Sequence, residues 1–434
     1  MRSIFWHRRD LRIDDNAGLY KALKTSSEVF PIFIFDSTIL SKLPNDDQRV
    51  LFIFQEIERL KKEYQIFGSD LKLFYGNPIE IIEEIALELK VKTVFTNRDY
   101  EPLALARDQS VFLNLQKHSI DFIGAKDHVI FEKNEILKSD GTPYTIYTPY
   151  SKKWKEKLND FYVSPYPTIN YSSSLAKESV FSPSISLEEM GFKSIQKNEF
   201  PNRVFNSEII ETYSETRDIP SVLGTSRLSI HLRFGTISIR NLVQFATQKN
   251  EKYLNELIWR DFYQMILFKF PLSINQSFKK KYDLIEWVNN ETHFQHWCEG
   301  KTGYPIVDAG MRELNETGFM HNRVRMIVAS FLTKHLLIDW RWGEAYFAEK
   351  LLDFELASNV GGWQWASSSG CDAAPYFRVF NPTLQMNKFD KDFKYIKKWV
   401  KEFGTEEYPE PIVEHTFARE RVLRVYKTAL TEIQ

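Results

Sequence analysis

The sequence predicts an N-terminal α/β domain built on a parallel sheet, followed by an all-α domain. Two observations support this prediction. In the first 130 residues, short apolar runs alternate with amphipathic stretches of helical length, which is typical of βαβ units. From residue 206 to about residue 428, helical periodicity dominates and no strand-like alternation persists. We therefore expect a Rossmann-like parallel-sheet layer in the N-terminal domain.

The expected strands are short apolar runs, as buried parallel strands are. They are Ile4–His7, Val29–Asp36, Leu71–Tyr75, Thr93–Thr96 and Asp121–Ile123. The helices expected between them are Asn16–Lys24, Gln48–Ile66, Pro78–Leu89 and about Leu103–His118. After the first strand the chain reads HRRDLRIDDN and lacks G-x-G-x-x-G. This absence disfavours a dinucleotide-dependent dehydrogenase.

The second half of the chain has a different composition. Residues 151–205 are rich in Ser, Pro and Tyr without sustained periodicity, which indicates a long surface connector. We therefore expect an α/β domain over 1–130, a connector over 131–205 and an all-α domain over 206–434. Its expected helices are Asn206–Thr216, Ile239–Thr247, Tyr253–Lys269, Ile306–Glu313, Asn322–Leu337 and Trp342–Leu352.

Composition excludes several classes of protein. The chain is 43% apolar and 26% charged, as folded globular proteins are, which argues against disorder. It contains no apolar run long enough for a membrane span, and we expect no signal peptide. Cys298 and Cys371 are its only cysteines, so we expect a cytoplasmic protein without disulfides or a metal site. The net charge of −1 means that any groove for nucleic acid must be local.

One predicted helix carries an unusual face. Glu256, Trp259, Arg260 and Tyr263 lie at positions i, i+3, i+4 and i+7 and therefore on the same side. A carboxylate, an indole, a guanidinium and a phenol together suit a planar ligand that forms hydrogen bonds. A structural ion-pair face is the alternative, and the residues alone leave both open.

Three further groups of residues are candidate binding sites, although each by itself is less specific evidence for a function. Asn322 and Met326 are i, i+4 neighbours and could meet a base edge and its apolar face, although Met in a core is the alternative. Thr225–Ser229 places three hydroxyls around an arginine, a plausible phosphate cradle. Gly361 and Gly362 lie beside two tryptophans and would let backbone approach a large flat group.

Together, these stretches resemble the DNA photolyase/cryptochrome family, and within it most closely the bacterial class I photolyases for cyclobutane pyrimidine dimers (CPDs). The resemblance runs from FWHRRDLRIDDN through TSRLS, ELIWRDFY, WCEGKTGYPIVDAGMR, MHNRVRM and NVGGWQWASSSGCDAAPYFRVFNP to YPEPIVEH. Seven motifs in order over essentially the whole chain make the resemblance highly specific.

The resemblance implies that the all-α domain binds FAD. When reduced and excited by blue or near-UV light, this cofactor donates an electron to a flipped-out dimer, which splits and returns the electron. An ion pair between Arg325 and Asp353 is implied under the flavin ring, and Asn359 matches the residue facing flavin N5. The implied cofactor contacts are Tyr213, Thr225, Ser226, Arg227, Leu228, Ser229, Tyr253, Arg325, Asp353, Phe354, Glu355 and Asn359.

The resemblance also assigns substrate and electron-transfer positions. Trp287, Trp340 and Trp363 match a chain of three tryptophans that carries electrons to oxidised flavin. The implied positions for the dimer and for DNA are Arg217, Glu256, Trp259, Asn322, Arg323, Met326, Trp365 and Gln385; Arg260 and Tyr263, on the face of Glu256, join this set.

The expected function is light-driven repair of CPDs in UV-damaged DNA by a monomeric lyase. A cryptochrome photoreceptor is one alternative, although only a short segment follows His415 where many cryptochromes carry a signalling tail. A (6-4) photolyase is a second, but it has histidines where Asn322 and Met326 stand; His321 remains as a substitute acid. A flavoprotein or DNA-binding module without enzymatic activity is a third. A second, antenna chromophore is an open expectation, and its identity is undetermined.

Overall fold

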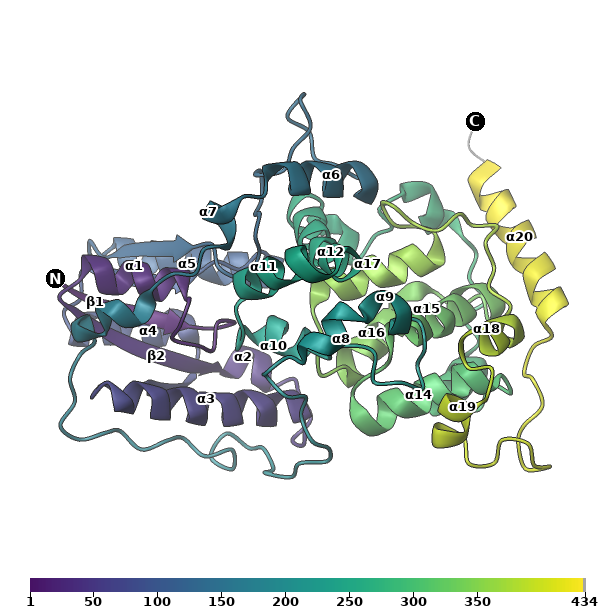
Figure 1. The fold of residues 1–434 in the computed structure, drawn as a ribbon, viewed down its shortest axis with the longest axis horizontal. Coiled ribbons are helices and arrows are strands. Elements are labelled where there is room, and N and C mark those ends of the chain that lie inside the picture. The colour runs from purple at the N-terminus through teal and green to yellow at the C-terminus, as the bar shows by residue number, and fades with distance from the viewer. Residues whose placement is uncertain (432–434) are drawn as a thin grey trace. The chain divides into compact units, whose positions relative to one another are not determined.

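The computed structural model describes residues 1–431 and divides into two compact units that are interleaved along the chain (Figure 1). The first unit comprises Met1–Glu132, Lys157–Val204 and Leu228–Phe245. The second comprises Lys133–Glu156 and Phe205–Arg227 and then continues from Ala246. Each unit is described by itself.

The first unit contains a five-stranded parallel sheet of order β3-β2-β1-β4-β5, which confirms the predicted class. Its strands are β1 (Arg2–His7), β2 (Glu28–Asp36), β3 (Lys72–Gly76), β4 (Thr93–Asn97) and β5 (Asp121–Ala125). Its helices include α1 (Ala17–Thr25), α2 (Ser37–Leu40), α3 (Gln48–Ile66), α4 (Pro78–Glu88), α5 (Pro102–Gln116), α7 (Asp160–Val163) and α10 (Ser229–Phe234); α11 (Ile239–Lys249) begins here.

Alternate residues of β1 face opposite helical layers. Ile4 and Trp6 are buried in a cluster with side chains of α4 and α5. Phe5 and His7 point the other way, where Phe5 meets Gly18 of α1 and the His7 ring bonds the Tyr64 hydroxyl of α3 at 2.7 Å. Helices therefore cover both faces of the sheet at β1, which explains why the inner strands β1, β2 and β4 are buried almost throughout. The edge strands β3 and β5 are only partly buried.

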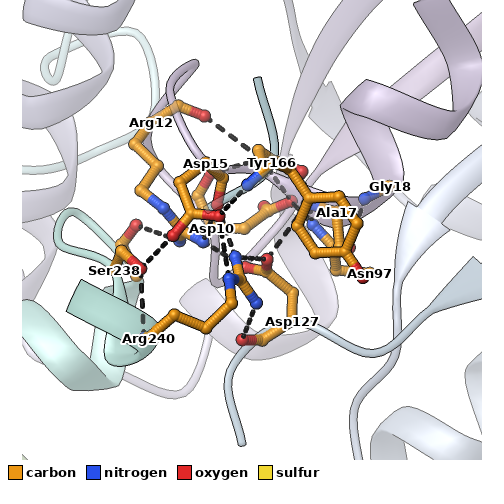
Figure 2. A network of polar contacts seen from close by, with 12 residues as sticks. Asp10, Arg12, Asp15, Ala17, Gly18, Asn97, Asp127, Tyr166, Ser238 and Arg240 are labelled. Atoms are coloured by element: carbon orange, nitrogen blue, oxygen red, sulfur yellow. Dashed lines mark hydrogen bonds and ion pairs between the residues drawn. The ribbon is translucent and has the colours of Figure 1, made fainter. Parts of the chain in front are cut away.

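A buried network of charges ties the loop after β1 to the segment that contains α11 (Figure 2). Arg12 donates to Asp127 at 2.7 Å, and Arg240 donates to Asp127 and to Asp15 at 2.8 Å each. Ser238 also bonds Asp15. Each charged side chain in this network contacts one of opposite charge, and these contacts offset the desolvation free energy of burying four ionised groups.

The second unit is helical in its described part, as predicted. Before residue 270 it contains α6 (Tyr147–Lys157), α8 (Ser207–Glu211), α9 (Tyr213–Thr216) and α12 (Glu251–Lys269). Beyond that lie α13 (Glu291–Glu299), α14 (Pro305–Thr317), α15 (Asn322–Ser330), α16 (Trp340–Lys350), α17 (Leu356–Ser367), α18 (Pro382–Phe389), α19 (Lys394–Trp399) and α20 (His415–Thr431). Its core contains Trp297, Trp340 and Trp363, each at most 2% exposed.

The segment predicted as a connector is more ordered than expected. Helix α6 lies within it, α7 follows, and residues 168–174 form a 3₁₀ helix. Periodicity missed α6 because it is anchored by a few aromatic side chains, among which Tyr150 and Trp154 are buried. Between residues 1 and 431, no helix has the length and apolarity needed to cross a bilayer.

Candidate functional site

The predicted polar and aromatic face lies on α12, and each of its four side chains has a different partner. Asn250 caps this helix by accepting the backbone N–H of Lys252 and of Tyr253. Trp259 stacks on an aromatic ring of α6, and Arg260 donates to Glu355 at 3.3 Å. The ring of Tyr263 occupies the space that a Cβ on Gly361 would need, at 2.3 Å. A glycine is therefore required at position 361 for α17 to pack against α12.

Glu256 is the acidic member of this face and is paired with Arg217, directly after α9. Burial raises the pKa of Glu256, and the guanidinium opposes the rise without cancelling it. The same guanidinium lies 5.2 Å from the centre of the Tyr213 ring. The structure thus brings together Glu256, predicted to contact the dimer, Arg217, predicted to contact DNA, and Tyr213, predicted to contact the cofactor.

Charged side chains connect this face to α15. Asp218 accepts a hydrogen bond from Arg323 at 2.7 Å and lies 3.9 Å from Arg217. Arg323 in turn lies 3.7 Å from the Met326 sulfur. The residues that the sequence placed at one dimer-binding site, from two distant helices, therefore belong to one connected group.

Two other predicted contacts lie at the edge of this group. Asn322 is exposed in the first turn of α15. Gln385 is half-buried on α18, the helix whose Phe389 ring lies 4.4 Å below the Arg323 guanidinium. Both side chains can therefore reach a ligand from solvent, while Arg323 is held between Asp218 and α18.

His321, the candidate substitute acid, serves as the N-cap of α15. Its Nδ1 accepts the backbone N–H of Arg323 at 3.2 Å, so the proton of the neutral ring is on Nε2. Burial lowers the pKa of His321 to about 4, helped by Arg323, Arg325 and Arg227 and opposed by Asp218. The ring is therefore uncharged at neutral pH, which makes it a poor general acid.

Several predicted cofactor contacts lie together beside the start of α12. The Tyr253 ring meets Tyr213 edge-on at 5.1 Å, and its hydroxyl lies 2.8 Å from that of Ser226. Burial raises the pKa of Tyr253 to about 12. Thr225 and Arg227 line a small cavity that is partly open to solvent.

Not every member of the predicted cradle can be placed in this cluster. Leu228 is buried and Ser229 exposed, and both belong to the first unit. Arg227, with a φ of 51°, adopts the left-handed conformation, and its guanidinium lies 4.3 Å above the Phe319 ring.

The predicted ion pair between α15 and the loop before α17 is present. Arg325 reaches the two carboxylate oxygens of Asp353 at 3.0 and 3.2 Å and donates through Nε to the Met320 carbonyl. Phe354 packs against the core, and Glu355 accepts from Ser358 as well as from α12. These bonds fix the entry to α17.

Asn359 on α17 has a partner that sequence reasoning missed. Its amide nitrogen donates to the carboxylate and to the backbone carbonyl of Glu344, at 2.8 and 3.0 Å. Burial raises the pKa of Glu344, although the bond from Asn359 opposes the rise. The nitrogen is thus committed to α16, and within residues 1–431 the amide oxygen accepts no hydrogen bond. No local pattern marks Glu344, because α16 reads as an ordinary amphipathic helix.

The three tryptophans of the predicted electron path lie in or against one core but not in ring contact with one another in the described chain. Trp363 packs against Gly343, where a Cβ would come within 2.1 Å of its ring. The neighbouring indole of Trp297, which was not predicted, lies 6.0 Å from Trp363 between ring centres. Trp340 is buried at the start of α16, and Trp287 meets Tyr426 edge-on at 6.1 Å.

The residues present fit a large flat anionic cofactor such as the FAD implied by the motifs. The unpartnered oxygen of Asn359 can accept a bond from a protonated ring nitrogen. A Cβ on Gly362 would meet no atom within 4 Å, so space opens above this turn of α17. The half-buried Trp365 follows on the same helix. Hydroxyl and guanidinium groups of Thr225 and Arg227 line the cavity described above and suit phosphates.

Comparison with known proteins identifies the family. A family model described as DNA photolyase matches residues 3–170, and one described as the FAD binding domain of DNA photolyase matches residues 253–405. The deoxyribodipyrimidine photo-lyase of Synechococcus sp. is 35% identical, with 99% of this chain and 98% of the relative covered. That of Escherichia coli is 36% identical, with 98% of each covered.

Solved structures agree with these matches. A class III photolyase from Agrobacterium tumefaciens superposes with a TM-score of 0.87 at 32% identity, covering 99% of this chain and 97% of its own. An archaeal photolyase from Sulfolobus tokodaii with two FAD molecules gives 0.83 at 34%, covering 99% and 100%. A cryptochrome from Synechocystis gives 0.84 at 25%, covering 98% and 99%. With its motifs, its fold and full-length relatives above 30% identity, the chain belongs to the DNA photolyase family.

Proposed function

We propose that this chain is a deoxyribodipyrimidine photo-lyase that repairs CPDs in DNA, using light absorbed by reduced FAD. The observation that carries the proposal is the connected group running from Glu256 through Arg217 and Asp218 to Arg323. It joins helices α12 and α15 through charged side chains, of which Glu256, Arg217 and Arg323 are those that the sequence assigned to dimer and DNA contacts.

When bound, FAD supplies the light-excited electron donor. The chain's own residues hold and shield that group. Glu344 fixes the Asn359 amide, whose oxygen would accept a hydrogen bond from a protonated nitrogen of the cofactor. The Arg325–Asp353 pair would help to hold the same group. Tyr253 and Ser226 close one edge of the cofactor cluster. Residues of α12 and α15 then receive the lesion.

The type of lesion that we propose as the substrate follows from the side chains at the predicted contact positions, none of which is a suitable acid. Reversal of a (6-4) product needs a proton donor near neutral pH, a task for which imidazole is suited. Asn322 and Met326 cannot serve, and His321 is neutral and engaged as a helix cap. A CPD needs only an electron and its return, while Asn322 bonds its polar edge and Met326 packs on its apolar face.

Further parts of the proposal concern the electron supply and the partners. Trp287, Trp340 and Trp363 form the path that reduces oxidised flavin, and Arg217 and Gln385 contact the DNA. The protein acts as a monomer in the cytoplasm. The proposal leaves room for a second, antenna chromophore of undetermined identity; the Sulfolobus tokodaii photolyase holds two FAD molecules, with the implication of a light-harvesting cofactor.

The deciding experiment illuminates the protein, reconstituted with FAD and chemically reduced, with oligonucleotides that carry one CPD or one (6-4) product. We expect CPD reversal and no (6-4) reversal, and no reversal in the dark. Efficient (6-4) reversal would assign the chain to the second alternative. Stoichiometric flavin without reversal of either lesion would favour a photoreceptor.

A further inference from the structure

The indole of Trp259 is covered on one face by a side chain that no motif had singled out. The Tyr147 ring lies parallel to it, with 3.7 Å between ring centres and 3° between planes. Phe262 meets the same indole edge-on at 5.5 Å, and Tyr263 meets it at a tilt of 34°. Tyr147 thus covers one face of the indole, so a ligand that stacks in parallel on Trp259 has to use the opposite face.

Tyr147 is held in this position by two hydrogen bonds to separate elements. Its hydroxyl donates to the backbone carbonyl of Asn255, one helical turn before Trp259, at 2.9 Å. Its backbone N–H donates to the Asp372 carboxylate at 3.0 Å. Because Tyr147 is the first residue of α6, Asp372 satisfies one of the free N–H groups of that helix from a distant loop.

The remainder of α6 is fixed to α12 by side-chain contacts as well. Trp154 donates its indole N–H to the buried Asp261 at 3.0 Å. The Tyr150 ring packs against Phe262 at 5.1 Å. Helix α6 therefore acts as a strap: Tyr147 cannot move away from Trp259 unless the contacts of Trp154 and Tyr150 with α12 are broken.

We infer that Tyr147 is a positioning residue for lesion binding, which fixes the plane of Trp259 so that the face opposite Tyr147 receives the pyrimidine dimer. This inference rests on the proposed function, which places Trp259 at the dimer. Asp372 follows α17, the helix that carries Trp365, so the same strap links the elements of both proposed dimer tryptophans.

The test compares the dark affinity of FAD-loaded variants for a CPD oligonucleotide and for its undamaged copy. Tyr147→Phe keeps the stack and should bind the lesion like the wild type. Tyr147→Ala and Tyr147→Leu remove the stack and should weaken lesion binding about two- to tenfold, with little effect on undamaged DNA. Tyr144→Ala is the matched control, because Tyr144 contacts the Tyr150 ring rather than Trp259.

A structural role alone would not produce this pattern. We expect the loss in affinity to exceed any loss in repair per photon at saturating DNA, and flavin content to match that of the wild type. Wild-type affinity in both Tyr147→Ala and Tyr147→Leu would overturn the inference, as would equal weakening in Tyr147→Phe. If Trp259→Ala loses lesion preference while Tyr147→Ala keeps it, only this inference fails. If the wild-type protein itself shows no preference for the lesion, the proposed function fails.

Discussion

Removing the Asp127 carboxylate from the buried network of the first unit should sharply destabilise that unit. Asp127 receives Arg12 at 2.7 Å, Arg240 at 2.8 Å and the backbone N–H of Ala17 at 3.1 Å. Its side chain is fully buried, and those of both arginines are at most 8% exposed. In Asp127→Ala, Arg12 loses its carboxylate partner while remaining out of contact with water.

Breaking one side of a buried ion pair costs about 3–5 kcal/mol. The first unit has about 200 residues, and for that size 1 kcal/mol corresponds to about 2–4 °C in Tm. We therefore expect the calorimetric transition of the first unit to fall by about 6–20 °C. The control is Glu28→Ala, which removes an exposed pair with Arg2 in the same unit and should cost less than about 1 kcal/mol. Equal shifts in the two variants would refute the reasoning.

The network also predicts a pH dependence. Burial by itself would raise the pKa of Asp127, but Arg12 and Arg240 overcome this and hold the pKa well below its ordinary value. A carboxyl with a depressed pKa in the folded state stabilises it above the pKa of the unfolded chain, about 3.9, and loses that contribution as the pH falls further. Wild-type stability should therefore decline below about pH 4 more steeply than that of Asp127→Asn.

Two further predictions concern the proposed site. Trp363→Phe should block photoreduction of oxidised flavin and largely spare repair by chemically reduced enzyme. The control is Trp297→Phe, which changes the indole 6.0 Å from Trp363 and should leave photoreduction intact. Equal photoreduction in wild type and Trp363→Phe would show that electrons take another route. DNA affinity should fall as the salt concentration rises, despite the net charge of −1, and the slope of log K against log salt should be about −0.9 for each neutralised phosphate. Arg323→Ala should make this slope shallower by the contribution of about one phosphate. An affinity for damaged duplex that does not depend on salt would contradict a basic groove.

Local patterns in the sequence were sufficient for the elements and for much of the residue set. Parallel strands buried on both faces must be apolar runs, so the inner strands β1, β2 and β4 could be predicted from composition and length alone. The partly buried edge strands β3 and β5 were predicted from their short apolar runs as well. The period of 3.6 residues likewise placed Glu256 and Trp259 on one face of α12, because helix geometry decides this without any tertiary contact. The Arg325–Asp353 pair was predicted through the resemblance and is present.

Contacts between residues far apart in the chain were decided only by the tertiary structure. Arg240 meets Asp15 across 225 positions, and Tyr147 covers Trp259 from a segment that was predicted to be a connector. Glu344 could not be recognised as the partner of Asn359, because hydrogen-bond partners depend on how α16 packs on α17. Periodicity records which side of an element is buried. It does not indicate which distant element packs against that side. At Trp259 and Asn359, the identity of the packing element sets the geometry of the site.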